Sequence, residues 1–220
     1  MSHSVNRTRR GVVKAAAAGL LSLPLAARGL RAQSADGVKS VQGRVLIDGR
    51  LATPGMAVTA DSQVETGPGA QAVFTIGDSG FLVRGRTLVI LRGEAPKDDR
   101  PSAVVRALTI ISGALLSVHG KGAKSIDTPV ATIGIRGTGL YVEARPNETY
   151  ACTCYGTVDL AARADPGVRE TVVTKYHDAP RLIRPDAILK ARVMNHSDRE
   201  LVLLESLFGR MPPFGQGGRY

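Results

Sequence analysis

Two cysteines separated by a single residue are the most chemically distinctive feature of this 220-residue chain. If the stretch around them is a β-strand, Cys152 and Cys154 project to the same face. Two histidines, His177 and His196, follow later in the chain. Thiolate sulfur and imidazole nitrogen are preferred zinc ligands, and both also suit copper. The four residues therefore indicate a Cys₂His₂ site for zinc or copper.

The same residues allow other interpretations. Cys152 and Cys154 could form a C-x-C redox pair. Cysteines of exported proteins often form disulfides, but a bridge between such close positions on one strand would be strained. Both thiols could also serve as small buried apolar residues. His177 is equally suited to a loop, and His196 to packing beside the start of a helix.

The first 35 residues have the pattern of an export signal. Arg9 and Arg10 precede Lys14, and a weakly apolar, alanine-rich run over residues 15–27 ends at Arg28. This run is too short for a stable membrane span. The pattern resembles a twin-arginine signal, which carries folded proteins across a bacterial inner membrane. It predicts a periplasmic or secreted protein, with a general secretion signal or an uncleaved basic anchor as the alternatives.

Most of the positive charge belongs to this N-terminal region. The chain has a formal net charge of +10, and residues 1–35 hold six basic and no acidic residues, so the remainder carries +4. Aromatic residues make up 4% of the chain and tryptophan is absent, which argues against surfaces that stack on bases. No later apolar run could span a bilayer. We therefore expect no nucleic-acid partner and no stable membrane span.

Residues 36–180 read as a series of short β-strands joined by turns. The Asp48-Gly49 pair is typical of a type I′ hairpin. Residues 104–118 are expected to form two strands broken at Ser112-Gly113, and residues 128–143 to be broken near Gly137. Short strands with turns every eight to twelve residues favour a sandwich or barrel. The predicted fold class is all-β.

The pattern changes after residue 180, and residues 181–220 are expected to form a C-terminal extension. Ser197 and Glu200 have the spacing of a capping box. Leu201 and Leu204 then fall on one helical face, which predicts a short helix over about residues 198–208. The chain from Met211 onward is expected to be an extended tail.

Three motifs resemble the FecR-like periplasmic domain family. They are Q-G-R-V at residues 42–45 with A-T-P-G-M at 52–56, V-E-T-G-P-G-A-Q-A-V-F at 64–74, and T-P-V-A-T-I-G-I-R-G-T at 128–138. The resemblance implies an antiparallel, jelly-roll-like β-sandwich with a sensing or protein-interaction role. Sensor members of the family are membrane-anchored anti-sigma factors. This sequence lacks their membrane helix, so we expect a free-standing exported member.

The third motif is expected to mark the fold. On a strand, Ile133 and Ile135 face the core, while Gly134 and Arg136 lie on the opposite face. Gly134 is expected to allow close packing or a bulge. Arg136 could bind a carboxylate or phosphate of a ligand or partner. Alternatively it is structural, pairing with an acid such as Glu143.

No catalytic motif accompanies these features. The patterns G-x-S-x-G, H-E-x-x-H and G-x-x-x-x-G-K-[ST] do not occur. We therefore expect a non-enzymatic protein that binds a small ligand or another protein of the cell envelope. The alternative is a metal-binding or thiol-redox envelope protein centred on the cysteine pair and the nearby histidines.

Overall fold

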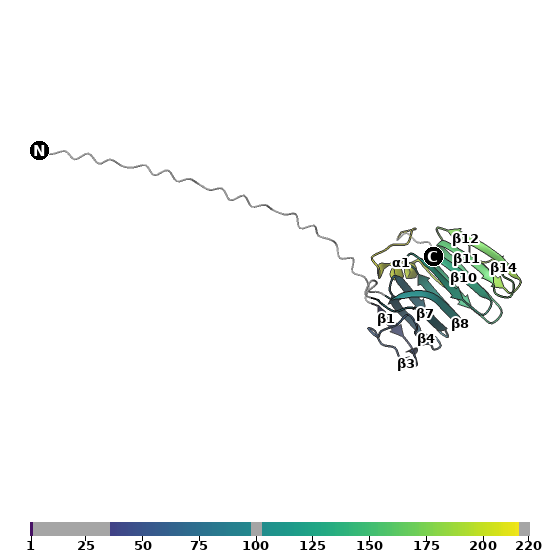
Figure 1. Cartoon of the computed structure of the whole chain (residues 1–220), viewed down its shortest axis with the longest axis horizontal. Helices are drawn as coiled ribbons and strands as arrows, with labels where there is room; N and C mark the ends of the chain where they lie inside the picture. The colour runs from purple at the N-terminus through teal and green to yellow at the C-terminus, as the bar shows by residue number, and fades with distance from the viewer. Residues whose placement is uncertain (2–35, 98–102, 216–220) are drawn as a thin grey trace. The chain divides into compact units, whose positions relative to one another are not determined.

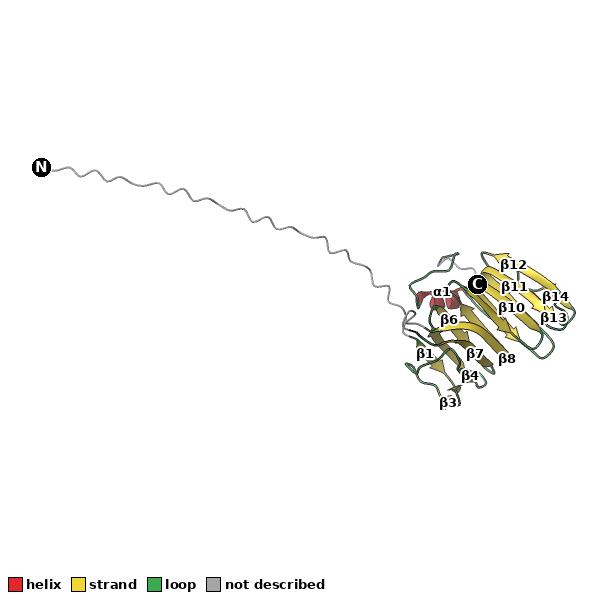
Figure 2. Cartoon of the chain, in the orientation of Figure 1, coloured by secondary structure: helices red, strands yellow, loops and turns green. Residues whose placement is uncertain are grey.

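The computed structural model describes Met1, residues 36–97 and residues 103–215 (Figure 1). The predicted export signal lies outside these residues. The described chain is all-β with one short helix, as expected (Figure 2). The strands are β1 (Gly37–Gln42), β2 (Val45–Ile47), β3 (Arg50–Leu51), β4 (Gln63–Thr66), β5 (Gln71–Ile76), β6 (Ser79–Val83), β7 (Leu88–Glu94), β8 (Val104–Val118), β9 (Ala123–Asp127), β10 (Ala131–Ala144), β11 (Thr149–Ala162), β12 (Arg169–Thr174), β13 (Arg181–Arg184) and β14 (Ala187–Lys190), and the helix is α1 (Asp198–Ser206).

The strands form two layers that share three long strands. One layer runs β1-β5-β6-β8-β10-β11-β13-β14, using the second halves of β8 and β10 and the first half of β11. The other runs β3-β2-β4-β7-β8-β9-β10-β11-β12, using the remaining halves of the long strands. All these pairings are antiparallel except β8–β9, which is parallel. The arrangement is a sandwich whose layers are joined by strands that pass from one to the other.

Strand β8 passes between the layers at Gly113. The chain continues as one strand there, where the sequence predicts two, but the predicted break coincides with a change of partner. Residues up to Ser112 pair with β7, and Gly113 begins the pairing with β10. Gly113 has φ +87°, and a Cβ there would lie 2.3 Å from the Thr87 hydroxyl. Glycine is therefore needed for both the backbone conformation and the close approach.

Strand β10 bends in the same way. Its register against β11 shifts between Arg136 and Gly139, close to the predicted break at Gly137. Ile133 and Ile135 are buried, as expected. The close packing expected at Gly134 occurs at Gly139 instead. A Cβ on Gly139 would lie 2.4 Å from the Tyr155 ring, whereas one on Gly134 would make an ordinary 3.6 Å contact with Asp159.

Two apolar clusters lie on opposite faces of the first layer. The inner core fills the space between the layers and draws side chains from nearly every strand. The second, which we call the outer cluster, lies on the other face of the first layer. Its sheet side includes a cross-strand row in continuous register. The row is Val73, Leu82, Leu116, Tyr141 and Cys152.

The C-terminal extension is part of the folded unit. Two strands that were not expected from the sequence extend the first layer: β13 pairs with β11, and β14 pairs with β13. Helix α1 begins after Ser197, as predicted, and the backbone N–H of Ser197 donates to Glu200 Oε2 at 2.9 Å. The helix packs on β6 and β8 (Figure 2).

Residues 211–215, which were expected to begin an extended tail, instead fold back onto the sheet. Phe214 packs against the rings of Tyr155 and Tyr176, with ring centroids 6.1 and 5.1 Å away. Phe214 thus joins the outer cluster, because removing its apolar ring from water lowers the free energy of the folded chain. Within the part of the chain that the structure describes, no helix has the length and apolar character to cross a membrane.

Candidate metal site

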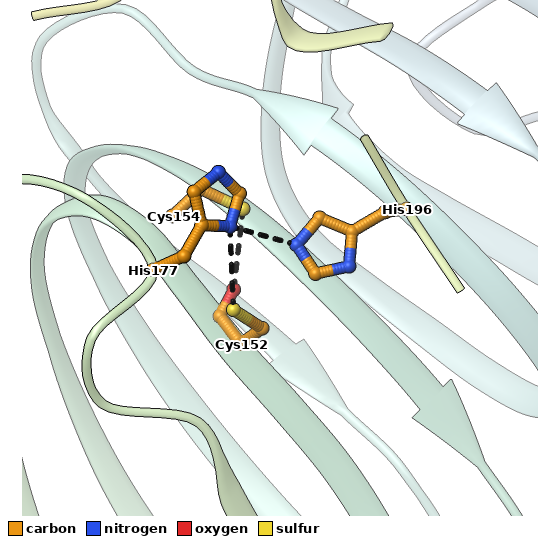
Figure 3. A group of neighbouring side chains, drawn as sticks. All are labelled: Cys152, Cys154, His177 and His196. Carbon is orange, nitrogen blue, oxygen red and sulfur yellow. Dashed lines mark hydrogen bonds between the residues drawn. The ribbon is translucent and has the colours of Figure 1, made fainter. Parts of the chain in front are cut away.

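The four residues singled out from the sequence converge beside the outer cluster (Figure 3). Cys152 and Cys154 lie on β11 and project from the same face of the first layer. His177 follows β12, and His196 immediately precedes the N-cap of α1. All four are buried, with exposed fractions of 0, 0, 2 and 9%. Three separate segments of the chain therefore supply one compact group.

The side chains point toward one another (Figure 3). The Nδ1 atom of His177 lies 2.9 Å from Nε2 of His196 and 3.6 Å from Sγ of Cys152. One ligand atom from each of the four residues can be chosen so that all lie within 4.8 Å of one another. With bonds of about 2.0 Å to nitrogen and about 2.3 Å to sulfur, ligand atoms of tetrahedral zinc lie about 3.3 to 3.8 Å apart. Small side-chain shifts would bring this group to that spacing.

Each histidine has a second partner on the ring nitrogen that faces away from the group. The carboxylate oxygen Oδ1 of Asp198 lies 3.0 Å from His177 Nε2. The carbonyl oxygen of Met194 lies 2.8 Å from His196 Nδ1. Both oxygens attract a proton onto the nitrogen that they face. If each ring donates to the oxygen that it faces, the two remaining nitrogens, Nδ1 of His177 and Nε2 of His196, face each other across 2.9 Å as lone-pair donors.

Two lone pairs at that distance repel each other unless a proton or a cation lies between them. Metal-ligating histidines characteristically donate their other N–H to a carboxylate or a backbone carbonyl. Asp198 and Met194 provide one of each. Tyr176 in turn donates to Asp198 Oδ2 at 2.8 Å, which fixes the carboxylate. The surroundings of both histidines therefore match those of metal ligands.

The thiols complete the donor set. Both cysteines are free, so the strained disulfide considered from the sequence is not formed. The hydrogen bond from Cys154 lowers the pKa of Cys152 to about 4, and the two histidines contribute further. Burial raises the pKa of Cys154 well above its usual value. A metal ion bound by both sulfurs would take them as thiolates and displace any proton that they hold.

The backbone around the histidines is unusual. His177 has φ +42° and Asn195, next to His196, has φ +62°, both in the left-handed region. Non-glycine residues seldom adopt these angles, and such strain is concentrated at sites that hold ligands. The backbone N–H of His177 donates to the carbonyl of Cys154 at 3.0 Å, which ties its loop to β11. Tyr141 stacks on the His196 ring at 4.8 Å.

The other candidate residue, Arg136, lies away from this group. Arg136 is largely exposed and pairs with Asp159 on β11, with Nη2 2.8 Å from Oδ2. Its partner is not Glu143, which lies beyond the bend in β10 and is held by Arg145 and Asn195. The ion pair supports a structural role for Arg136, and its role in ligand binding remains a prediction.

Asp198 is the important residue that the sequence analysis passed over. It lies in the first turn of α1, between the capping-box residues Ser197 and Glu200. The sequence places Asp198 only two residues after His196, which could have drawn attention to it. Its contact, however, is with His177, and only the fold brings these two residues together. His119, the remaining histidine outside the signal region, is buried separately between Ser79 and Ser117.

Comparison with known proteins leaves the chain without a family assignment. No protein-family model and no curated protein matches it. Two crystal structures of a candidate anti-sigma factor from Parabacteroides distasonis are similar, with 13 and 12% identity and TM-scores of 0.46 and 0.45. Each match spans 59% of this chain and 59% of the other. Likeness at this level carries no conclusion about function, and the resemblance to FecR-like domains remains a prediction.

Proposed function

We propose that this protein binds one zinc ion through Cys152, Cys154, His177 and His196. The observation that carries the proposal is the pair of facing nitrogens of His177 and His196, each oriented by an oxygen on its far side. Two thiolates balance the charge of one divalent cation, so the loaded centre is neutral. A neutral centre suits a site surrounded by apolar side chains.

The donor set favours zinc over copper and iron. Tetrahedral coordination by two sulfurs and two nitrogens is characteristic of zinc. Blue-copper sites use two histidines, one cysteine and a weak axial ligand, whereas here two cysteines are available. An iron–sulfur cluster spreads its protein ligands over two or more metal ions. The four atoms within 4.8 Å of one another suit a single ion.

The proposed centre has a structural role. Four protein ligands fill a tetrahedral ion's coordination sphere, whereas catalytic zinc sites keep one position for water or substrate. All four ligands are also buried. The protein is therefore proposed to be a non-enzymatic, zinc-containing β-sandwich. In this proposal the two cysteines bind the metal and do not act as a redox pair.

Metal analysis of the full-length protein tests this proposal. Protein purified without chelator from zinc-supplemented cells should hold about one equivalent of zinc. The Cys152→Ser/Cys154→Ser variant should hold almost none, while His119→Gln, which alters a buried histidine elsewhere, should match the wild type. Cobalt substitution should give the visible absorption of tetrahedral, thiolate-bound Co²⁺. Wild-type protein without zinc, or with stoichiometric copper under equal supply of both metals, would refute the assignment.

The cellular setting is a second proposal, supported by the sequence of the N-terminal region. Paired arginines before a weakly apolar run favour export of the folded protein, and export after folding suits a protein that acquires its metal in the cytosol. The role would be to bind a ligand or another protein of the cell envelope, as the FecR-like motifs suggest. Cell fractionation with an antibody to the folded domain tests the compartment.

A further inference from the structure

Residues 191–214, which we call the C-terminal segment, cover the outer face of the first layer. Leu201 and Leu204 of α1 are fully buried in the outer cluster, and Leu207, Phe208 and Phe214 pack around them. Beneath them lie the cross-strand row that begins at Val73 and ends at Cys152, and the Tyr150 ring. The segment is thus a cover over an apolar sheet surface.

The sandwich has a core that does not include this cover. The inner core consists of side chains between Val38 and Ile183, with Ile188 at its margin. No described residue of the C-terminal segment belongs to it. Helix α1 has nine residues, too few to be stable in water without packing partners. The order of the segment therefore depends on its attachment to the sheet, whereas the sandwich has an independent source of stability.

The candidate metal site lies at the junction of the two. Cys152 and Cys154 belong to the sheet, and His196 belongs to the C-terminal segment. His177, in the loop tied to β11, contacts Asp198, the first residue of α1. An ion bound by all four residues would crosslink the segment to the sheet at His196, next to the N-cap of α1.

We propose that zinc binding controls attachment of the C-terminal segment, so that loss of the ion releases residues 191–214 and uncovers the outer face while the sandwich stays folded. This inference rests on the proposed zinc site. Without the ion, the facing nitrogens of His177 and His196 lose their common ligand, and the left-handed backbone at His177 and Asn195 loses one of the interactions that offset its strain. Release of His196 relieves the contact between the rings.

The far end of the segment has its own contacts and does not depend directly on the ion. The Tyr155 hydroxyl donates to Glu205, and Arg210 bonds both Glu205 and the backbone carbonyl of Asp78. These contacts lie beyond α1's midpoint.

The end near His196 is also bonded to the sheet, because Arg84 donates to the Asn195 carbonyl and Tyr150 bonds the backbone of Arg192 and Met194. Release of the segment must break these bonds as well, and the ion is the contact at this end that depends on metal supply.

Hydrogen exchange of the full-length protein, monitored by mass spectrometry with and without zinc, tests the proposal. If only the protein with its C-terminal segment attached binds the ion, the equilibrium constant for release of the segment falls by the factor 1 + [Zn]/Kd. Free zinc at about 100 times the Kd should therefore slow exchange in residues 191–206 about 100-fold. Strands β4, β7 and β9, which belong to the second layer, should exchange at the same rate in both states.

A ligand variant makes the test independent of how the metal is removed. Cys152→Ala/Cys154→Ala removes only sheet-side ligands, and it should show fast exchange in residues 191–206 at every zinc concentration. Leu203→Ser, on the exposed side of α1, is the matched control and should retain the zinc response. Protection of the sandwich strands in the same spectra reports whether each variant is folded.

The possible outcomes separate the two proposals. One equivalent of bound zinc with unchanged exchange in residues 191–206 would overturn the release mechanism and leave the zinc site intact. Loss of protection throughout the sandwich on zinc removal would also overturn it, because the ion would then stabilise the whole domain. Absence of bound zinc in the wild type would overturn both.

Discussion

The Nδ1 atom of His177 and the Nε2 atom of His196 face each other at 2.9 Å in the protein interior, and each ring is held from behind by an oxygen. The Asp198 carboxylate is the acceptor behind His177, and the Met194 carbonyl is the acceptor behind His196. This relationship is the observation on which the proposed zinc site rests. It also identifies the residues whose replacement should affect the ion without removing a ligand.

Replacement of Asp198 by asparagine should weaken zinc binding. The amide cannot provide the charge that keeps a proton on Nε2 of His177, and loss of such an outer partner typically lowers metal affinity 10- to 100-fold. Competition with a chromophoric chelator measures the change. Glu200→Gln removes another acid from the same turn of α1 without touching either histidine. Equal weakening in both variants would show that the effect comes from the helix and not from the histidine.

Acidification should destabilise the protein through His119. Burial lowers the pKa of His119 to about 3, and the charges of Lys124 and Arg210 add to the shift. Between about pH 6.5 and pH 3 the unfolded chain binds a proton that the folded chain does not, so stability falls as pH falls, by about 1.4 kcal/mol per unit.

A His119→Gln variant isolates this contribution. Urea unfolding of wild type and variant at pH 7, 6 and 5 gives the free energy of unfolding for each. The wild type should lose about 2 kcal/mol more than the variant between pH 7 and pH 5. Parallel losses in the two proteins would mean that His119 is protonated in the folded state.

Gly139 should be intolerant of a side chain. The methyl group of alanine would lie 2.4 Å from the Tyr155 ring, and overpacking of this kind typically costs about 1 to 3 kcal/mol. Gly134→Ala is the matched variant on the same strand, because its methyl group would meet Asp159 at an ordinary 3.6 Å. Thermal and urea unfolding should show a clear loss for the first and little change for the second. A neutral Gly139→Ala would contradict the packing described for β10 and β11.

Export should depend on the paired arginines. Arg9→Lys/Arg10→Lys preserves the charge of the N-terminal region but removes the arginine pair that distinguishes a twin-arginine signal. Fractionation should find the wild type outside the inner membrane and the variant retained in the cytoplasm. Unchanged export of the variant would favour a general secretion signal.

Local sequence features predicted much of the fold. Alternating apolar residues indicated strands because side chains on a strand point alternately to its two faces. Asp48-Gly49 forms its hairpin with both residues at positive φ. Helix α1 follows its capping box, whose residues are only three positions apart. The breaks expected near Gly113 and Gly137 mark real bends, although each strand continues through its bend.

The sequence by itself determined most strands up to residue 180, their turns, the start of α1 and the four residues that could bind a metal, because each depends on residue type and short-range spacing. Only the tertiary structure decided that these four meet. Cys152 and His177 are 25 residues apart and His177 and His196 a further 19, so their approach depends on how β12 and α1 return to β11. The same packing placed Asp198 behind His177 and Phe214 in the outer cluster, since neither contact has a counterpart in local sequence.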